Sequence, residues 1–403
     1  MRDYYFEFVC NSTRPQFEKL HAEKNPIAKA RDDFDKAIPA TFIWKDLEKP
    51  RDSFVMLRGQ YNKPGQQVWP NVPAVLPPLP KSGTTNRLDL AKWLVSPQHP
   101  LTARVAVNRF WQQLFGTGLV KSAADFGAQG EAPSHPELLD WLSVTFREQG
   151  WDMKQFVKLL VTSATYRQDS KATPQKIAAD PENRHYARGP RFRLDAEQVR
   201  DNALAVSGLL VPRIGGPSVN PYSPFDLWRE VSHYGSTPAT AQVFVQDHGE
   251  KLYRRSMYTY WKRTAPPASM VAFDAPNREV CTVARGNTNT PLQALVLLND
   301  VQFVEAARVF AERLLAAAPD DDARLRHAFL AVLSRPPAAA EAAVLSRALA
   351  RERVRYARDG AAARALLTAG ESPRDERIPA PEHAAWTHVA SLVLNLSETV
   401  MRN

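Results

Sequence analysis

Helix-start signals recur along this chain, and each is followed directly by apolar residues at helical spacing. A hydroxyl, carboxylate or amide side chain at the first position can accept from the free backbone N–H groups of a helix, and an acid or amide three residues later can reciprocate. The pattern occurs as SHPE at 134–137, DMKQ at 152–155 and TPLQ at 290–293, and Asp195 precedes a similar segment at 196–210. The sequence therefore predicts a mainly α fold with a multi-helical body.

Prolines separate the N-terminal part from this body. Residues 1–40 intersperse apolar and charged side chains, which predicts an amphipathic helical arm that needs a partner surface. Residues 41–85 contain prolines at 64, 70, 73, 77, 78 and 80, which predict an extended strap with a short strand or two. Alternation in 254–264 adds at most a minor β element. We expect a single large α-helical domain at 86–403.

Charge and composition narrow the range of partners. The 403-residue chain carries a formal charge of +9, which fits an anionic partner such as an acidic glycan, or solubility alone. Its arginines are spread along the chain and form no nucleic-acid-binding motif, so we do not expect nucleic acid as a partner.

Cofactor and membrane signals are also missing from the sequence. Cys10 and Cys281 have no metal-ligand spacing, and there is no C-x-x-C-H motif for haem attachment, so we expect no metal and no cofactor. Whether the two cysteines pair in a disulfide is open at this point. No run of about 18 apolar residues predicts a membrane span, and no signal peptide is visible.

The densest group of polar side chains lies in 273–290, directly before the TPLQ helix start. These side chains can be structural, as ion pairs that hold the loop down. Alternatively, they can bind a carboxylate or sulfate through charge-assisted hydrogen bonds, with flat aromatic faces nearby for a sugar ring. The ligand-binding candidates are Asn277, Arg278, Arg285 and Asn289, with Tyr258, Tyr260 and Trp261 as the aromatic residues.

Two groups of acids are weak candidates for catalysis. Asp274 and Glu279 could act as the paired carboxylates of a glycoside hydrolase. His135 stands near Glu137 and Asp140, close enough along one helical turn to share a proton or a metal ion. The capping pattern at 134–137 already accounts for His135 and Glu137 without any chemistry.

Three long motifs carry a family resemblance. They are FDAPNREVCTV, TNTPLQALVLLND and, upstream, NRLDLAKWLVSPQHPLTARVAVNRFWQQLFGTGLV. Over about residues 50–400 the chain resembles the C-terminal domain of unknown function, the planctomycete "PSD" domain family, of large secreted planctomycete and verrucomicrobial proteins. The resemblance implies a cytochrome c-like domain in the same or a neighbouring protein, and a periplasmic or extracellular location. It implies no reaction and no catalytic residue.

Two functions from different classes follow from these observations. The first is a structural or binding domain that docks a cytochrome-like domain or binds anionic polysaccharide. The second is a glycan-acting hydrolase that uses Asp274 and Glu279. No catalytic motif is recognisable, which favours the first, and whether the chain is an enzyme is left open.

Overall fold

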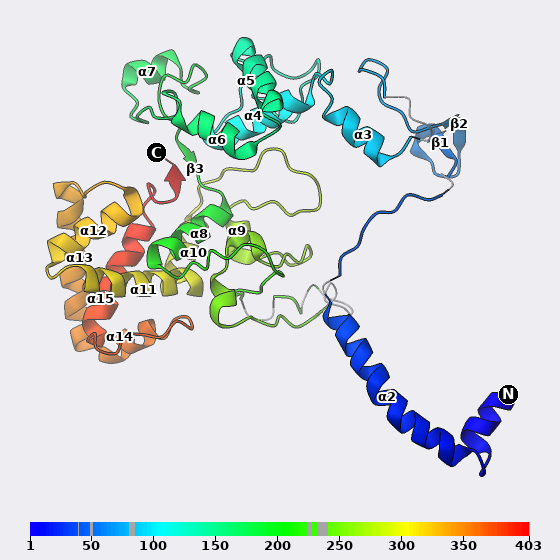
Figure 1. Cartoon of the computed structure of the whole chain (residues 1–403). Coiled ribbons are helices and arrows are strands. Elements are labelled where there is room, and N and C mark those ends of the chain that lie inside the picture. The colour runs from blue at the N-terminus through cyan, green and yellow to red at the C-terminus, as the bar shows by residue number, and fades with distance from the viewer. Residues whose placement is uncertain are drawn as a thin grey trace. The chain divides into compact units, whose positions relative to one another are not determined.

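The computed structural model describes residues 1–38, 40–48, 51–79, 85–224, 227–229, 231 and 241–402 (Figure 1). Pro80 of the predicted strap lies outside these residues. The described part contains fifteen α-helices and two small two-stranded sheets, which confirms the mainly α fold with a minor β element. The chain forms two compact units, Met1–His99 and Pro100–Asn403, which are described separately below. The three-part division at residues 40 and 85 stays a prediction.

The first unit begins with a helical arm. Helix α1 (Arg2–Tyr4) continues into a π-helical turn (Tyr5–Val9), and α2 spans Arg14–Ala37. None of the described side chains of α2 is buried. Its apolar residues Leu20, Ile27 and Phe34 are exposed, as expected of an arm that lacks its partner surface.

A hairpin and a short helix follow the arm. The predicted strand in the proline-rich segment is present, as β1 (Ser53–Met56) pairs antiparallel with β2 (Pro64–Val68). Asn86 caps α3 (Arg87–Leu94) by accepting from the Leu88 and Asp89 N–H groups, and Asp89 accepts from Asn86 in return. Trp93 donates to the Pro77 carbonyl over 2.6 Å, which fixes the end of the strap to α3.

The second unit opens with a helical layer formed by α4 (Thr102–Phe115), α5 (Pro136–Glu148) and α6 (Met153–Thr162). Val107, Trp111 and Phe156 are at its core. Buried Asn108 exchanges two hydrogen bonds with the backbone of Val120, and so holds the turn after α4. A Cβ at Gly118 would lie 2.6 Å from the Asn108 amide nitrogen, so only glycine fits at that position.

A middle region connects this layer to the C-terminal helices. It contains α7 (Pro174–Ala179), α8 (Ala196–Ser207), α9 (Ala268–Ala272) and strand β3 (Phe192–Arg193), which pairs with β4 (Met401–Arg402). The alternating stretch 254–264 forms no strand. It contains the 3₁₀ turn Ser256–Tyr258 and two isolated bridges, from Arg254 to Val211 and from Thr259 to Val219. At its start, buried Arg254 and Ser256 alternate with exposed Arg255 and Met257 along an irregular chain.

The C-terminal bundle consists of α10 (Pro291–Asn299), α11 (Val301–Ala317), α12 (Asp321–Leu333), α13 (Ala339–Arg358), α14 (Gly360–Leu367) and α15 (Ala380–Leu394). Helix α15 contacts α11, α12, α13 and α14 (Figure 1). Its fully buried Trp386 and Val389 share one core with Phe310 of α11 and Phe329 of α12. A second core, around Phe273, Leu297 and Phe303, joins α8, α9, α10 and α11.

A buried ionic cluster fastens the segment after α14 to α11. Arg308 donates to the carbonyls of Ala369 and Ser372, and Glu305 accepts from the Ser372 N–H and the Tyr253 hydroxyl. Gly370 has a φ of 82°, and a Cβ there would lie 2.0 Å from the Glu305 carboxyl carbon. Glycine is required at 370 because it alone lets the backbone approach this carboxylate.

Of the predicted caps, some are confirmed and others are wrong. Asp152 accepts from the Gln155 N–H over 3.0 Å, and Gln198 accepts from the Asp195 N–H over 3.1 Å. Helix α8 ends at Ser207, earlier than predicted, because Gly208 turns left-handed. Ser134 makes no cap, since its hydroxyl donates to the Leu119 carbonyl and α5 begins at Pro136.

The predicted cap between Thr290 and Gln293 is also wrong. Thr290 precedes α10 but makes no side-chain cap. The Gln293 side chain is buried and donates to the hydroxyl of Thr288 instead. The bond to Thr288 takes the Gln293 amide away from the predicted cap.

Candidate functional site

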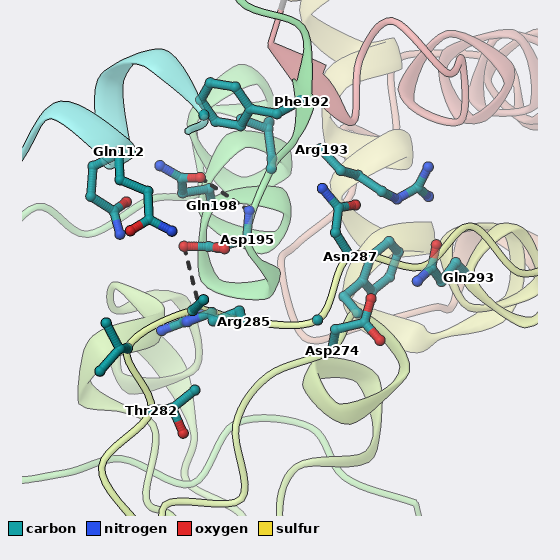
Figure 2. Close-up of a pocket in the computed structure, with 17 residues that line it drawn as sticks. Gln112, Phe192, Arg193, Asp195, Gln198, Asp274, Thr282, Arg285, Asn287 and Gln293 are labelled. Atoms are coloured by element: carbon teal, nitrogen blue, oxygen red, sulfur yellow. Dashed lines mark hydrogen bonds and ion pairs between the residues drawn. The ribbon is translucent and has the colours of Figure 1, made fainter. Parts of the chain in front are cut away.

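A polar cavity of about 280 Å³ lies in the second unit, beside the 273–290 loop (Figure 2). Helix α4 contributes Gln112 and Gln113, and the loop and α10 contribute the opposite side chains. The β3 strand and the start of α8 complete the lining. The polar lining residues that matter below are Gln112, Gln113, Arg193, Asp195, Gln198, Asp274, Arg285, Asn287 and Gln293.

Arg285 is tied to the first turn of α8. Its guanidinium donates to both carboxylate oxygens of Glu197, over 2.5 and 3.3 Å, and lies 3.7 Å from Asp195. Burial opposes the charge of Arg285, but the Glu197 hydrogen bond and charge outweigh it and raise the pKa of Arg285. The predicted anion-binding guanidinium therefore already has a carboxylate partner within the protein.

The pKa values of the two carboxyl groups next to Arg285 shift in opposite directions. Burial raises the pKa of Asp195, and the charge of Arg285 only partly offsets that effect. Burial acts the same way on Glu197, but its hydrogen bond from Arg285 prevails and the pKa of Glu197 is lowered. Asp195, which lines the cavity, is thus the acid more readily protonated.

Arg278 and Glu279 are engaged outside the cavity lining. The Arg278 guanidinium lies over the Trp261 ring at 4.3 Å and 3.9 Å from Glu197. The Trp261 indole N–H donates to the Asn277 carbonyl. Glu279 pairs with Arg263 at 3.3 Å. Of the predicted acid pair, only Asp274 lines the cavity.

Asp274 closes the loop at its base. Its carboxylate accepts from both the backbone N–H of Thr288, over 2.8 Å, and the Thr288 hydroxyl. The backbone at Asp274 is left-handed, with a φ of 61°, a conformation that aspartate tolerates better than most residues. The carboxylate therefore has a fixed place and direction at the cavity wall.

Arg193 of β3 is close enough to Asp274 for the two charges to interact. It donates to the Asn289 side chain over 3.2 Å, which accounts for the predicted binding residue Asn289. Burial lowers the pKa of Arg193, and the nearby charge of Asp274 acts against that shift. The charged lining side chains thus occur as neighbours of opposite charge.

The other predicted residues lie elsewhere in the second unit. The Tyr258 hydroxyl accepts from the Gly215 N–H, and the Arg254 guanidinium covers its ring at 3.9 Å. Tyr260 packs against Trp228. Neither tyrosine, nor Trp261, is among the residues that line the cavity. Their predicted role in ligand binding stays a prediction.

His135 is next to Ser134 and packs against the Tyr186 ring. Asp140 pairs with Arg104 at 2.6 Å. Within the described ranges, no three His, Cys, Asp or Glu side chains gather where they could hold a metal ion. Both cysteines are free thiols. Among the helices that the structure describes, none has the length and apolar character needed to cross a bilayer.

Sequence patterns missed several residues of the cavity, namely Gln112, Arg193, Asp195, Gln198 and Gln293. Arg193 is held in place by β4, about two hundred residues later in the chain, and short-range periodicity cannot reveal such a pairing. The sequence pattern at Asp195 predicts only a helix cap. The one signal in the sequence is a glutamine, Gln293, within the otherwise apolar run at 291–298.

A family model described as a protein of unknown function (DUF1553), PSD1, matches residues 86–349, about two thirds of the chain. The match confirms the family resemblance of the sequence motifs. Searches of curated proteins and of solved structures each gave no match. The matched part includes α4, β3, α8 and the whole 273–290 loop. Since the match covers about two thirds of the chain, the chain belongs to the PSD1 family of proteins of unknown function.

Proposed function

We propose that the Pro100–Asn403 unit is a binding domain whose cavity takes a small, uncharged, hydroxyl-rich ligand the size of one sugar unit. The observation that carries this proposal is the lining, which is rich in amide side chains and contains charged groups already matched by opposite charges. A volume of about 280 Å³ is at the small end of ligand pockets, which span roughly 300–1,000 Å³.

The charge balance of the cavity favours a neutral ligand. Arg285 is bound to Glu197 and lies near Asp195, and Arg193 lies near Asp274. An anionic ligand would have to compete with these carboxylates for the same guanidinium groups, and would face their repulsion. The earlier expectation of an anionic polysaccharide held by Arg278 and Arg285 therefore has less support than a neutral saccharide.

The amides supply the free hydrogen-bonding capacity. No side chain in the described part of the structure pairs with the amides of Gln112, Gln113 or Asn287, which line the cavity. An amide offers both donors and an acceptor, which suits hydroxyl groups. Phe192 and Phe273 add apolar lining for the ring carbons.

A second candidate, hydrolysis, is favoured by one observation. Asp195 and Asp274 line the same cavity, and burial raises the pKa of Asp195 as a general acid requires. Glycoside hydrolases use two such carboxylates. In this alternative Asp195 takes the place first considered for Glu279, which pairs with Arg263 outside the cavity lining.

Titration of the full chain with D-glucose, D-galactose, D-mannose and D-glucuronate, followed by NMR, tests the proposal. We expect saturable binding of at least one neutral sugar, weakened about tenfold in Asn287→Ala, the equivalent of about 1.4 kcal/mol. Asn299→Ala is the matched control, because Asn299 bonds to the Leu295 carbonyl of its own helix. Binding of glucuronate alone, or equal effects of both variants, would contradict the proposal.

The hydrolase alternative needs a separate measurement. Release of reducing ends from neutral oligosaccharides, lost in Asp195→Asn and in Asp274→Asn with sugar binding retained, would favour the enzyme. Binding of a sugar without any release of reducing ends would support the binding domain instead of the hydrolase.

A further inference from the structure

Helix α5 carries an exposed tryptophan between two acids on its outer face. Glu137, Trp141, Val144 and Glu148 are spaced i, i+4, i+7 and i+11, so their side chains form one stripe along the helix. Trp141 is 55% exposed and Val144 is 41% exposed. No ion pair joins Glu137 or Glu148 to a residue that the structure describes. An exposed aromatic residue with a charged rim is typical of a contact surface.

Helix α13 carries the opposite charge at the same spacing. Arg347, Arg351, Val354 and Arg358 form a stripe on its outer face, and Val354 is 52% exposed. Arg351 bonds to Glu352 but keeps 71% of its side chain exposed. In the described part of the chain, neither Arg347 nor Arg358 has an acidic partner. The stripe is therefore a net positive surface with an apolar residue within it.

The two stripes are complementary in charge and in length. Eleven residues separate Glu137 from Glu148, and eleven separate Arg347 from Arg358, which is about 16 Å along either helix. The acids at the two ends of one stripe can therefore meet the arginines at the two ends of the other, whichever way the helices run.

The inner positions of the stripes also match. When the two helices run parallel, Trp141 lies opposite Arg351, whose guanidinium can cover the indole ring. Val144 then lies opposite Val354. Burial of these apolar groups adds to the attraction between the charges, which alone contribute little at an exposed surface.

The stripes of one copy do not cover each other, because α5 and α13 lie apart within the Pro100–Asn403 unit (Figure 1). We propose that the α5 stripe of one copy docks on the α13 stripe of a second copy. This head-to-tail contact leaves one stripe of each kind free, so it can extend to a ring or a longer chain. A contact between two helix faces is small, so we expect the association to be weak and to depend on salt. This inference goes beyond the proposed function and does not depend on the cavity ligand.

Sedimentation velocity of the full chain, at up to a few hundred micromolar, tests the contact. We expect concentration-dependent association at about 0.05 M salt that weakens at about 0.5 M salt, because salt screens surface charges. The acidic-stripe variant, Glu137→Lys with Glu148→Lys, should weaken association at least about tenfold through like-charge repulsion. The basic-stripe variant, Arg347→Glu with Arg358→Glu, should do the same.

The control variant is Glu250→Lys with Glu376→Lys, which reverses two exposed acids elsewhere in the same unit. It should associate as the unaltered protein does. Lysine and glutamate are both good helix formers, so the variants should fold, and their melting temperatures check this. The acidic-stripe and basic-stripe variants mixed in equal amounts should associate again, because the first keeps the basic stripe and the second keeps the acidic stripe.

Several outcomes overturn the head-to-tail contact. A chain that is monomeric at every concentration and at both salt concentrations does so. Association that either variant retains on its own also overturns it, since the copies would then meet through another surface, such as the exposed helical arm. A mixture of the two variants that stays monomeric excludes the pairing of α5 with α13. Sugar binding in the cavity is measured separately, so failure of this contact leaves the proposed function as it stands.

Discussion

The cavity loop and the C-terminal bundle are both held by arginine–acid contacts, but in different surroundings. In the bundle, the Arg308 side chain is 1% exposed and bonds to two carbonyls and to Glu312. In the loop, the Arg285 side chain is 33% exposed and bonds to Glu197 on α8. The residue types are the same, and burial is what separates the two.

Burial determines how much each contact contributes to the free energy of unfolding. Removal of one partner from a buried ionic group leaves an uncompensated charge and destabilises by about 3–5 kcal/mol, whereas exposed pairs contribute roughly 0–1 kcal/mol. The loop is therefore expected to open locally at little free energy while the bundle stays folded. We therefore expect the C-terminal bundle to act as a rigid platform and the 273–290 loop to act as a cavity wall that can open locally.

The strongest test of the platform is Trp386→Ala. Trp386 is fully buried where α15 packs on its neighbours. Loss of a buried aromatic side chain should lower the free energy of unfolding by about 3–5 kcal/mol. Denaturant unfolding would measure this change, and a loss below about 1 kcal/mol would show that the bundle is not the main source of stability.

Acid should weaken the platform through His383. Burial lowers the pKa of His383 from 6.5 to about 4, and its Nε2 is 3.0 Å from the Arg308 carbonyl. The unfolded chain takes up this proton first as the pH falls. The stabilisation that depends on neutral His383 is therefore fully present above pH 6.5 and is lost as the pH falls from 6.5 to about 4. The free energy of unfolding should decrease by up to about 3 kcal/mol over this range. His383→Gln should remove this part of the pH dependence. An unchanged difference in unfolding free energy between pH 7 and pH 4 would contradict the assignment.

Glu197→Gln should loosen the wall and spare the platform. The variant removes the charge that holds Arg285 and lies near Arg278. We expect amide hydrogen exchange in 278–287 to accelerate several-fold, with the free energy of unfolding lowered by less than about 1 kcal/mol. Asp140→Asn, which removes the exposed partner of Arg104, is the control. A large global loss would mean that the loop and the bundle unfold together.

The smallest effect is expected at Thr290, which directly precedes helix α10. Thr290 makes no side-chain cap on α10, whereas Asp320 accepts from the Ala323 N–H of α12 over 2.8 Å. Thr290→Ala should therefore change the free energy of unfolding by a few tenths of a kcal/mol at most, and Asp320→Ala should lower it by about 1 kcal/mol. Equal losses would show that the two helix starts are equivalent.

Local patterns predicted the helices well and the site only in part. Apolar periodicity alone predicts a helix over Val301–Ala317, and α11 has these bounds, because a helix that packs on a core must repeat apolar residues. The same approach identified the loop but not its partners. Glu197 lies 88 positions before Arg285, and Arg193 lies 96 positions before Asn289. Such pairings depend on how the helices pack, which no local spacing records.

The clamp between Asp274 and Thr288 allows the loop to vary in length. The exposed tip at 279–281 lies between the clamp and the lining residues, and Val280 is among its most exposed side chains. Doubling the length of a flexible loop costs only about 0.6 kcal/mol of closure entropy. Insertions at this tip should therefore be tolerated while the two ends remain in place. Relatives could reshape the rim of the cavity by changes in loop length alone, with Arg193 and Gln293 unmoved at its wall.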